Sequence, residues 1–474
     1  MKLWRDEQYS QPLHSDDVSR RDGGAPTAWI RLNLTLAHPR AAFSIASPAI
    51  STTTIRAMLT AETLKEALNT LDTDSLGAAD MAAFYVRRPR LKTAQLVNEL
   101  RLTKSNKKFL FIGHRGGGKS TELVHVAGEL TAQFNVVNIP VYSVFQSGEL
   151  THEELIFAIF SRLASDAVDR QWLAAGALPK LREAFLDGAI ASVHRWLFGP
   201  VPGSTTTDTT LKMELGGWGV KLEQKLAFDG SVRKNLVGKA GEFLELIDRF
   251  LAEIRGATSR HTLLIVEDLD KFDIAATEKL FFDHAQTLLR PQAHVIYTFP
   301  VSMRFSDRFP IVGQSFTPYY LPNLATRHRD GTPDPEGCRL LREILTKRAW
   351  ESLFAPGVLD YLIDHGGVVR DLIKLAQNAV NTADADGRAQ VSLADAKEAF
   401  SDAMRTRQSI LRPGDYPLLE QFSGKPVTNT PDIQRLLFNG SLLEYQNTTG
   451  DWCAPSPDAQ ALLASPERPA LPKP

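Results

Sequence analysis

The 474-residue chain has little cysteine, no long apolar run and almost no net charge. Its two cysteines, Cys338 and Cys453, stand far apart and outside any Cys/His cluster, which excludes a disulfide framework and a structural zinc site and predicts a reducing compartment. No apolar run approaches the roughly 18 residues that span a bilayer, and the first residues lack the apolar core of a secretory signal. We therefore expect a cytoplasmic protein with no membrane partner.

The charges of the chain nearly cancel, with 54 Lys and Arg against 55 Asp and Glu. A protein that coats nucleic acid by bulk charge is therefore excluded, although a local basic patch is not. Hydrophobic residues make up 43% of the chain, which is typical of globular proteins. At about 100–200 residues per domain, this length predicts two to four domains.

The pattern within residues 58–330 is that of an α/β unit. Short apolar runs alternate there with amphipathic helices, which is typical of a mostly parallel sheet. The apolar runs predict strands at 108–112, 135–142, 262–266, 294–299 and 316–321. An insertion at about 171–237 interrupts the unit, and its pattern predicts a helix at 178–198 and a hairpin at 211–228.

The flanking segments differ from this core. Residues 1–57 are expected to be a poorly ordered extension, 338–406 a small helical domain, 413–464 a winged-helix-like domain and 465–474 a Pro-rich tail. The winged-helix assignment rests on the order of two short helices followed by a hairpin. Helix starts are predicted at Thr60 or Thr63, and at Thr151, whose capping box is completed by Glu154.

The strongest motif is GHRGGGKST at 113–121, which fits GxxxxGK[ST] and lies between the apolar run KFLFI and the helical run TELVHVAGEL. Glycines are needed because backbone N–H groups must close around phosphate oxygens, and the following helix N-terminus adds to the attraction. Lys119 is expected to reach the β- and γ-phosphates and Ser120 to bind Mg²⁺. The expected nucleotide contacts are Gly113, His114, Arg115, Gly116, Gly117, Gly118, Lys119, Ser120 and Thr121.

A second acidic strand completes the expected site. The run TLLIV at 262–266 ends in Glu267 and Asp268, which we assign to Mg²⁺ and to water activation respectively, with the two roles open to exchange. The alternative is a buried strand that ends in a solvated acidic turn. Asp270 and Lys271 fall in the turn that follows and are assigned no ligand.

Two further residues fit the same site. Thr298 ends the strand 294–299, where a polar side chain can sense the γ-phosphate, although a satisfied strand-end hydroxyl is the alternative. Arg370 begins a helix after Gly366 and Gly367, where the helix dipole disfavours a cation, so we expect an anionic partner rather than a surface arginine.

With these motifs, residues of about 80–405 resemble the AAA+ ATPases, and more narrowly the bacterial branch near origin-recognition-type initiators and STAND ATPases. The resemblance is carried by GHRGGGKST as Walker A, LLIVED as Walker B, Thr298 as sensor 1 and Arg370 in GGVVRDL as sensor 2. It implies an α/β P-loop NTPase fold with a parallel sheet, a helical lid and a C-terminal winged-helix-like domain, with ATP and Mg²⁺ as cofactors.

The resemblance also implies a catalytic arginine supplied by a neighbouring subunit, for which Arg308 is the first choice and Arg304 the second. The chain departs from the family in three respects. Glu-Asp replaces Asp-Glu, threonine replaces the commoner asparagine at sensor 1, and a long insertion separates Lys119 from Glu267.

These features predict an ATP-binding and ATP-hydrolysing switch or motor subunit that couples its ATP or ADP state to a homo-oligomer or a partner protein. The resemblance suggests bacterial defence or stress signalling. The alternative is an ATP-regulated DNA-binding protein that uses the winged-helix-like tail and the basic segments RRPRLK and KSNKK. A small-molecule kinase is disfavoured by the appended helical modules.

Overall fold

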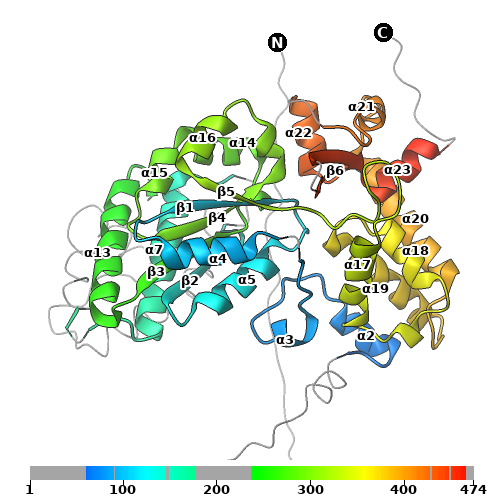
Figure 1. Ribbon diagram of the computed structural model, residues 1–474, viewed down its shortest axis with the longest axis horizontal. Helices are drawn as coiled ribbons and strands as arrows, with labels where there is room; N and C mark the ends of the chain where they lie inside the picture. The colour runs from blue at the N-terminus through cyan, green and yellow to red at the C-terminus, as the bar shows by residue number, and fades with distance from the viewer. Residues whose placement is uncertain are drawn as a thin grey trace, which may run out of the picture. The chain divides into compact units, whose positions relative to one another are not determined.

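The computed structural model describes residues 60–89, 91–145, 149–174, 176–177, 181, 236–426, 430–447 and 450–465 (Figure 1). The predicted extension at 1–57, the helix at 178–198 apart from Leu181, the hairpin at 211–228 and the Pro-rich tail at 465–474 apart from Ser465 lie outside these residues. No helix in the described ranges is both long and apolar enough to cross a membrane.

The core is a five-stranded sheet whose strand pairs are all parallel, in the order β2-β3-β4-β1-β5. The strands are β1 (Lys108–Gly113), β2 (Phe134–Pro140), β3 (His261–Glu267), β4 (His294–Pro300) and β5 (Thr317–Leu321). All five predicted strands are confirmed. The second ends earlier than predicted because Pro140 has no N–H for a ladder, and the chain turns there into α6 (Val141–Val144).

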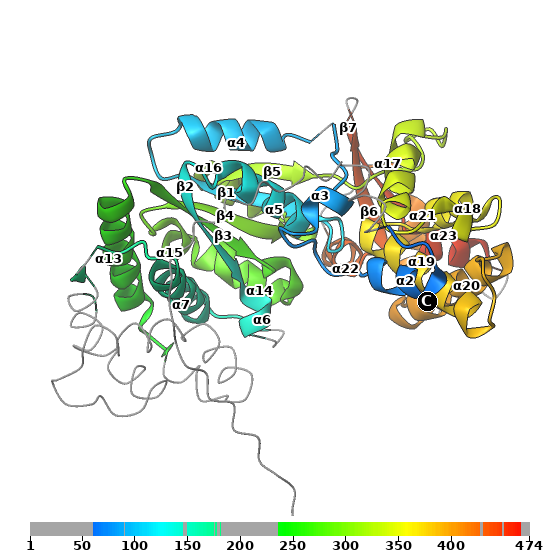
Figure 2. The ribbon, with the colours of Figure 1, turned by 90° about the horizontal axis from the view of Figure 1, so that it is seen from below.

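Both faces of the sheet are covered by helices, as its nearly continuous apolar strands require. Phe109 and Phe111 of β1 pack with α4 (Thr93–Leu102) and α5 (Lys119–Leu130), whereas Leu110 and Ile112 face α7 (His152–Asp169) and α13 (Ala240–Thr258). Figure 2 shows α4 and α7 on opposite sides of the sheet. The period-2 alternation of one strand thus builds two cores.

Short helical segments connect the last three strands. They are η1 (Leu269–Lys271), α14 (Ile274–Glu278), η2 (Lys279–Asp283), α15 (Ala285–Leu289), η3 (Val301–Phe305) and α16 (Phe309–Ser315). The capping box predicted for the long helix α7 is present, because the Thr151 hydroxyl accepts from the Glu154 N–H and the Glu154 carboxylate accepts from the Thr151 N–H.

A second cluster of apolar side chains forms the helical lid. Its elements are α2 (Leu64–Thr70), α17 (Pro335–Thr346), η4 (Glu351–Leu353), α18 (Val358–His365), α19 (Val369–Ala385) and α20 (Leu393–Ile410). Thr63 caps α2, as one of the two predicted choices. Although α2 precedes the sheet in the chain, it belongs to the lid core, since Gln377 of α19 donates to the Leu68 carbonyl over 3.1 Å and Ala61 pairs with Ala349.

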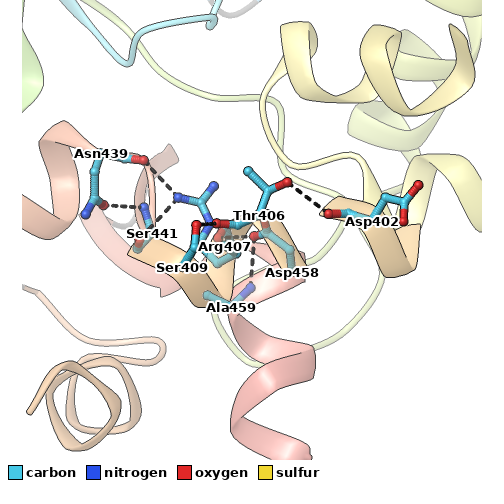
Figure 3. Close-up of polar contacts among 9 residues, drawn as sticks. Asp402, Thr406, Arg407, Ser409, Asn439, Ser441, Asp458 and Ala459 are labelled. Carbon is cyan, nitrogen blue, oxygen red and sulfur yellow. Dashed lines mark hydrogen bonds and ion pairs between the residues drawn. The ribbon is translucent and has the colours of Figure 1, made fainter. Parts of the chain in front are cut away.

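The winged-helix-like part has α21 (Asp415–Gln421), α22 (Pro431–Phe438), the antiparallel hairpin β6 (Leu442–Asn447) and β7 (Gly450–Pro455), and α23 (Pro457–Ala464). The helix α23 is an addition to the predicted order of helix, helix and hairpin. Arg407 of α20 joins the lid to this part (Figure 3), donating to the Asp458 carboxylate over 2.9 Å and to the Asn439 carbonyl over 2.8 Å.

Gly337 in the first turn of α17 allows the lid to pack against the connection from β5. A Cβ at this position would lie 1.8 Å from the Ala325 carbonyl oxygen. We expect Gly337→Ala to lower the free energy of unfolding by about 1–3 kcal/mol, the usual cost of overpacking.

The matched control is Gly241→Ala in the first turn of α13, where a Cβ would meet nothing within 4 Å. Because alanine favours helix, we expect the control to change the free energy of unfolding by less than about 1 kcal/mol, towards stability. Urea unfolding followed by tryptophan fluorescence compares the two. Equal stability of both variants would contradict the packing argument.

Candidate nucleotide site

The loop between β1 and α5 turns on glycines in left-handed conformation. Gly116 and Gly118 have φ of +81° and +95°, values that other residues rarely adopt. The Gly117 N–H donates to the His114 carbonyl over 3.0 Å, and this bond closes the loop. The first N–H groups of α5 then lie at its N-terminus without helical partners, which is the usual anion-binding arrangement.

Lys119 is buried and points back into the loop. Its Nζ lies 2.9 Å from Asp270 Oδ2, and it donates to the carbonyls of Gly113 and His114 over 2.9 and 2.8 Å. Burial alone would raise the pKa of the Asp270 carboxyl, but the charge and hydrogen bond of Lys119 hold that pKa below its usual value. Asp270, to which the sequence assigned no ligand, is therefore the ionic partner of the Walker A lysine.

Ser120 and Glu267, the two expected Mg²⁺ ligands, are brought together. The Ser120 hydroxyl hydrogen-bonds the Glu267 carboxyl group, and Asn138 Nδ2 donates to Glu267 Oε1 over 3.1 Å. Burial raises the pKa of Glu267 to about 7, and the charges of Asp268 and Asp270 add to the rise. Asn138 was not predicted, because an asparagine in the middle of an apolar strand has no motif around it.

These oxygen donors fit Mg²⁺, and the buried Asn138 Oδ1 beside them has no hydrogen-bond partner. No three His, Cys, Asp or Glu side chains among the described residues converge into a closed metal site. A magnesium ion held by Ser120 and Glu267 would therefore take its other ligands from water and phosphate, as Mg²⁺ usually does.

Asp268 has a strained backbone at the end of β3. Its φ is +72°, a left-handed value that is uncommon outside glycine. Its carboxylate lies 2.8 Å from Lys271 Nζ and lines the pocket beside the loop. Backbone strain of this kind is often found at functional sites, where the surrounding structure holds it.

Thr298 lies one layer behind the pocket. Its hydroxyl accepts from the Leu269 N–H over 3.0 Å and donates to the Val266 carbonyl over 3.5 Å, so it joins β4 to the turn that carries the acids. Thr298 is fully buried and is not among the residues that line the pocket. This geometry matches the strand-end hydroxyl alternative, and a direct contact with the γ-phosphate stays a prediction.

Arg370 lies against the loop, as its predicted role requires. Its backbone N–H donates to the Gly116 carbonyl over 3.0 Å, and its side chain lines the pocket with Lys119 and Ser120. A Cβ on Gly116 would come within 2.9 Å of Arg370 Cβ, so any other residue at position 116 would push the lid away from the loop. The lid thus touches the loop through main-chain atoms.

The two arginines considered for a neighbouring subunit lie elsewhere. Arg308 is about half exposed, lies 2.6 Å from Asp283 and packs over the Phe282 ring, away from the pocket lining. Arg304 forms ion pairs with Glu444 and Asp451 of the winged-helix hairpin. In this conformation Arg304 is therefore engaged within its own chain.

His114 links the loop to the winged-helix hairpin. Its Nε2 accepts from the Glu444 backbone N–H over 2.7 Å, and Asn323 Nδ2 donates to the Glu444 carbonyl over 3.2 Å. Burial, with the nearby charge of Lys119, lowers the pKa of His114 to about 3, so the ring is neutral and can accept. The motif predicted His114 as a nucleotide contact but gave no signal of this second partner.

Arg88, just before α4, is another residue that the motifs missed. Its Nη2 donates to the Gly117 carbonyl over 2.8 Å, and its buried Nη1 has no hydrogen-bond partner. The only sequence signal was the basic run RRPRLK, which is usually a solvated face.

The pocket beside the loop is lined by Thr73, Asp74, Ser75, Arg115, Gly116, Gly118, Lys119, Ser120, Thr121, Asp268, Asp270, Lys271, Arg348, Val369, Arg370 and Ile373.

In the parallel sheet, β4 lies between β1, which leads into the loop, and β3, which carries the acids. Together with the helical lid and the winged-helix-like part, this strand order defines an AAA+-like P-loop NTPase fold and confirms the predicted fold class. No family model and no curated protein matches the chain.

Several solved structures are similar to the chain. Cdc6p from Pyrobaculum aerophilum is 13% identical, over 82% of this chain and 96% of that one, with a TM-score of 0.38. The ORC2 protein of Aeropyrum pernix, in ADPNP and ADP complexes, is 13% identical over 84% and 98%, with a TM-score of 0.38. The RuvB Holliday junction branch migration motor of Thermotoga maritima is 11% identical over 76% and 90%, with a TM-score of 0.32. At these TM-scores the likeness adds no argument to the chain's own geometry.

Glu267→Gln tests the electrostatics of the site. The pKa of Glu267 is raised from 4.5 to about 7, so the folded protein holds a proton that the unfolded chain has lost between these pH values, and the wild type loses stability as pH rises through 7. We expect the neutral variant to be more stable than wild type at pH 8, with the difference shrinking towards pH 5. Thermal unfolding of nucleotide-free protein across this range measures the difference, and a pH-independent difference would contradict the assignment.

Proposed function

We propose that the chain binds ATP with Mg²⁺ between the loop and the lid, hydrolyses it, and acts as a switch that passes its nucleotide state to a partner. The proposed division is a core at 58–330, a lid at 338–406 and a winged-helix-like domain at 413–464. The observation that carries the proposal is the convergence of Lys119, Asp268 and Arg370 on one pocket at the N-terminus of α5. Both cysteines are free, which fits a cytoplasmic location.

The reaction is phosphoryl transfer to water. A water oxygen attacks the γ-phosphorus, the bond to the bridging oxygen breaks, and the proton of the water passes to a carboxylate. We assign that carboxylate to Asp268, which lines the pocket, and the metal contact to Glu267, which touches Ser120. Bound Mg²⁺ would neutralise charge that develops on the phosphate oxygens.

Lys119 is already positioned for the phosphates. Its ammonium group bonds two loop carbonyls and Asp270. A phosphate oxygen is a stronger acceptor than a neutral carbonyl, so ATP can replace the carbonyls while Asp270 keeps the lysine in place. Arg370, whose main chain contacts Gly116, would respond to the same phosphates from the lid.

Coupling to a partner would run through the winged-helix hairpin. Glu444 is held by His114 of the loop, by Asn323 after β5 and by Arg304 after β4. Filling the loop with phosphate changes the surroundings of His114 and of Lys119 behind it, so nucleotide binding can alter this grip. The exposed Arg308 is proposed to reach the site of a neighbouring subunit, because its surface ion pair with Asp283 costs little to break.

A protein partner fits the charges better than DNA. In the segment KSNKK, Lys107 pairs with Glu99, and the buried Lys108 Nζ donates to the carbonyls of Pro291 and Ala293. In the winged-helix-like part, Arg435 pairs with Asp415. These groups are used inside the chain. The DNA-binding alternative predicts a salt-dependent shift of labelled duplex DNA, which protein docking does not. A role in defence or stress signalling rests on the resemblance alone.

Two variants test hydrolysis. Lys119→Ala removes the charge that meets the phosphates, so we expect ATP binding to be lost. Asp268→Ala leaves the loop intact, so we expect binding to persist while turnover falls by about 100-fold or more, the range of a lost general base. Calorimetry measures binding and phosphate release measures turnover. Full turnover in Asp268→Ala would move the water-activating role to Glu267, and no ATP binding by the wild type would reject the proposed function.

Arg304→Ala tests the coupling. The Cys453 thiol is buried in β7, next to the strand that carries Glu444, so its reactivity reports release of the hairpin. In a Cys338→Ser background we expect Arg304→Ala to raise the rate of thiol labelling about tenfold, which corresponds to about 1.4 kcal/mol of lost restraint. Mg·ATP should raise the rate in the wild type but not with Lys119→Ala.

Arg308→Ala is the matched control for this labelling. It removes an arginine whose side-chain contacts in the described part of the chain are with Asp283 and the Phe282 ring, neither of which belongs to the hairpin. The labelling rate should stay at the wild-type value. Equal rates for Arg304→Ala and Arg308→Ala would show that Arg304 does not hold the hairpin.

A further inference from the structure

Arg348 is a buried arginine of the lid that lines the same pocket as Lys119 and Arg370. It follows α17 and is 5% exposed. Its Nη1 donates to the Ile344 carbonyl over 2.8 Å, and its guanidinium lies over the Phe84 ring, 5.4 Å from the ring centre. No carboxylate among the described residues lies within ion-pair distance of it. No motif in the sequence pointed to this residue.

A buried cation without a counter-charge is costly, and arginine cannot relieve that cost by losing its proton. Desolvation lowers the pKa of Arg348 to about 10, so it stays charged at neutral pH. One carbonyl and one aromatic ring use only part of its five N–H groups. The charged guanidinium group of Arg348 therefore lies beside the pocket with N–H donors available to a ligand.

The other charges of the pocket point the same way. Its two lysines are each paired with an acid, Lys119 with Asp270 and Lys271 with Asp268. Its three arginines, which come from the loop, from α19 and from the end of α17, have no ion pair among the described residues. They are Arg115, Arg370 and Arg348. The lining also includes Asp74, so five cations face three carboxylates. The remaining excess of positive charge predicts an anionic ligand.

We propose that Arg348 is a nucleotide-binding residue that donates to the phosphate chain, as a second lid arginine beside Arg370. The proposal rests on the proposed ATP site and adds a contact to it. An arginine fork suits phosphate oxygens, and an anion in the pocket would supply a counter-charge for Arg348, which has no carboxylate partner among the described residues. The lid would then hold the nucleotide from two places, the turn after α17 and the start of α19.

The competing explanation is a structural arginine that only packs on Phe84. Arg348→Gln separates the two. If Arg348 binds phosphate, the variant should bind ATP and ADP about 10- to 100-fold more weakly, the usual effect of losing a charged hydrogen bond, with adenosine binding unchanged. The nucleotide-free melting temperature should be equal to or above that of wild type, because a buried unpaired charge has been removed. The shift in melting temperature caused by ATP should shrink.

Arg339→Gln is the matched control, because Arg339 is an exposed arginine of α17 that pairs with Glu336 and Glu343. It should bind ATP as wild type does. Arg348→Lys keeps the charge without the fork and should bind with intermediate affinity. Wild-type affinity in Arg348→Gln, or a lower nucleotide-free melting temperature with an unchanged ATP shift, would overturn the proposal. If wild type itself binds no ATP, the proposed function fails first.

Discussion

The main-chain atoms of the loop at 113–117 are the constraint on which the site depends. The carbonyls of Gly113 and His114 accept from Lys119, that of Gly116 from the Arg370 N–H and that of Gly117 from Arg88. In a trans peptide the carbonyl and the next N–H point in opposite directions. These donors therefore fix the orientation of the loop peptides, and the Gly117 N–H is itself used by the His114 carbonyl.

The same edge of the sheet concentrates features that cost stability. Glu267 and Asp270 are buried within one turn of each other, Lys119 is desolvated, and Asp268 has a left-handed backbone. The desolvation cost of such charges is offset only when their partners are well placed. Here Lys119 and Asn138 offset part of it. The apolar clusters on both faces of the sheet supply the stability of the fold. The residues at this edge can therefore serve ligand binding although they lower the free energy of unfolding.

The sequence was sufficient for the features that local pattern determines. Apolar runs placed the five strands, and the capping box at Thr151 was visible because its partner Glu154 lies three residues away. For the first helix the pattern left Thr60 and Thr63 open, and the structure has Thr63 as the cap. The loop and the acidic strand were found through short motifs, and Ser120 and Glu267 do meet. Thr298 shows the limit of this reasoning, since its position on the strand was right but its hydroxyl is used by the main chain of the neighbouring turn.

The residues that the sequence did not reveal act through distant contacts. The packing of the sheet and lid brings three such residues to the site, and their neighbours in the chain do not indicate it. They are Asp270, Asn138 and Arg348. The pairing of His114 with Glu444 spans 330 positions. Pattern reasoning detects residues that are close in the chain, whereas these contacts are decided by which elements pack together.

Two separate connecting segments of the chain join the lid to the core. The first runs from α2, which packs in the lid, to Arg88 at the loop, and the second runs from β5 to α17. A body attached at two points can turn about the line that joins them but cannot slide away. The lid is also joined to the core through the winged-helix-like part, by Arg407 on one side and Arg304 on the other, so a turn of the lid about its two attachments has to move the hairpin as well.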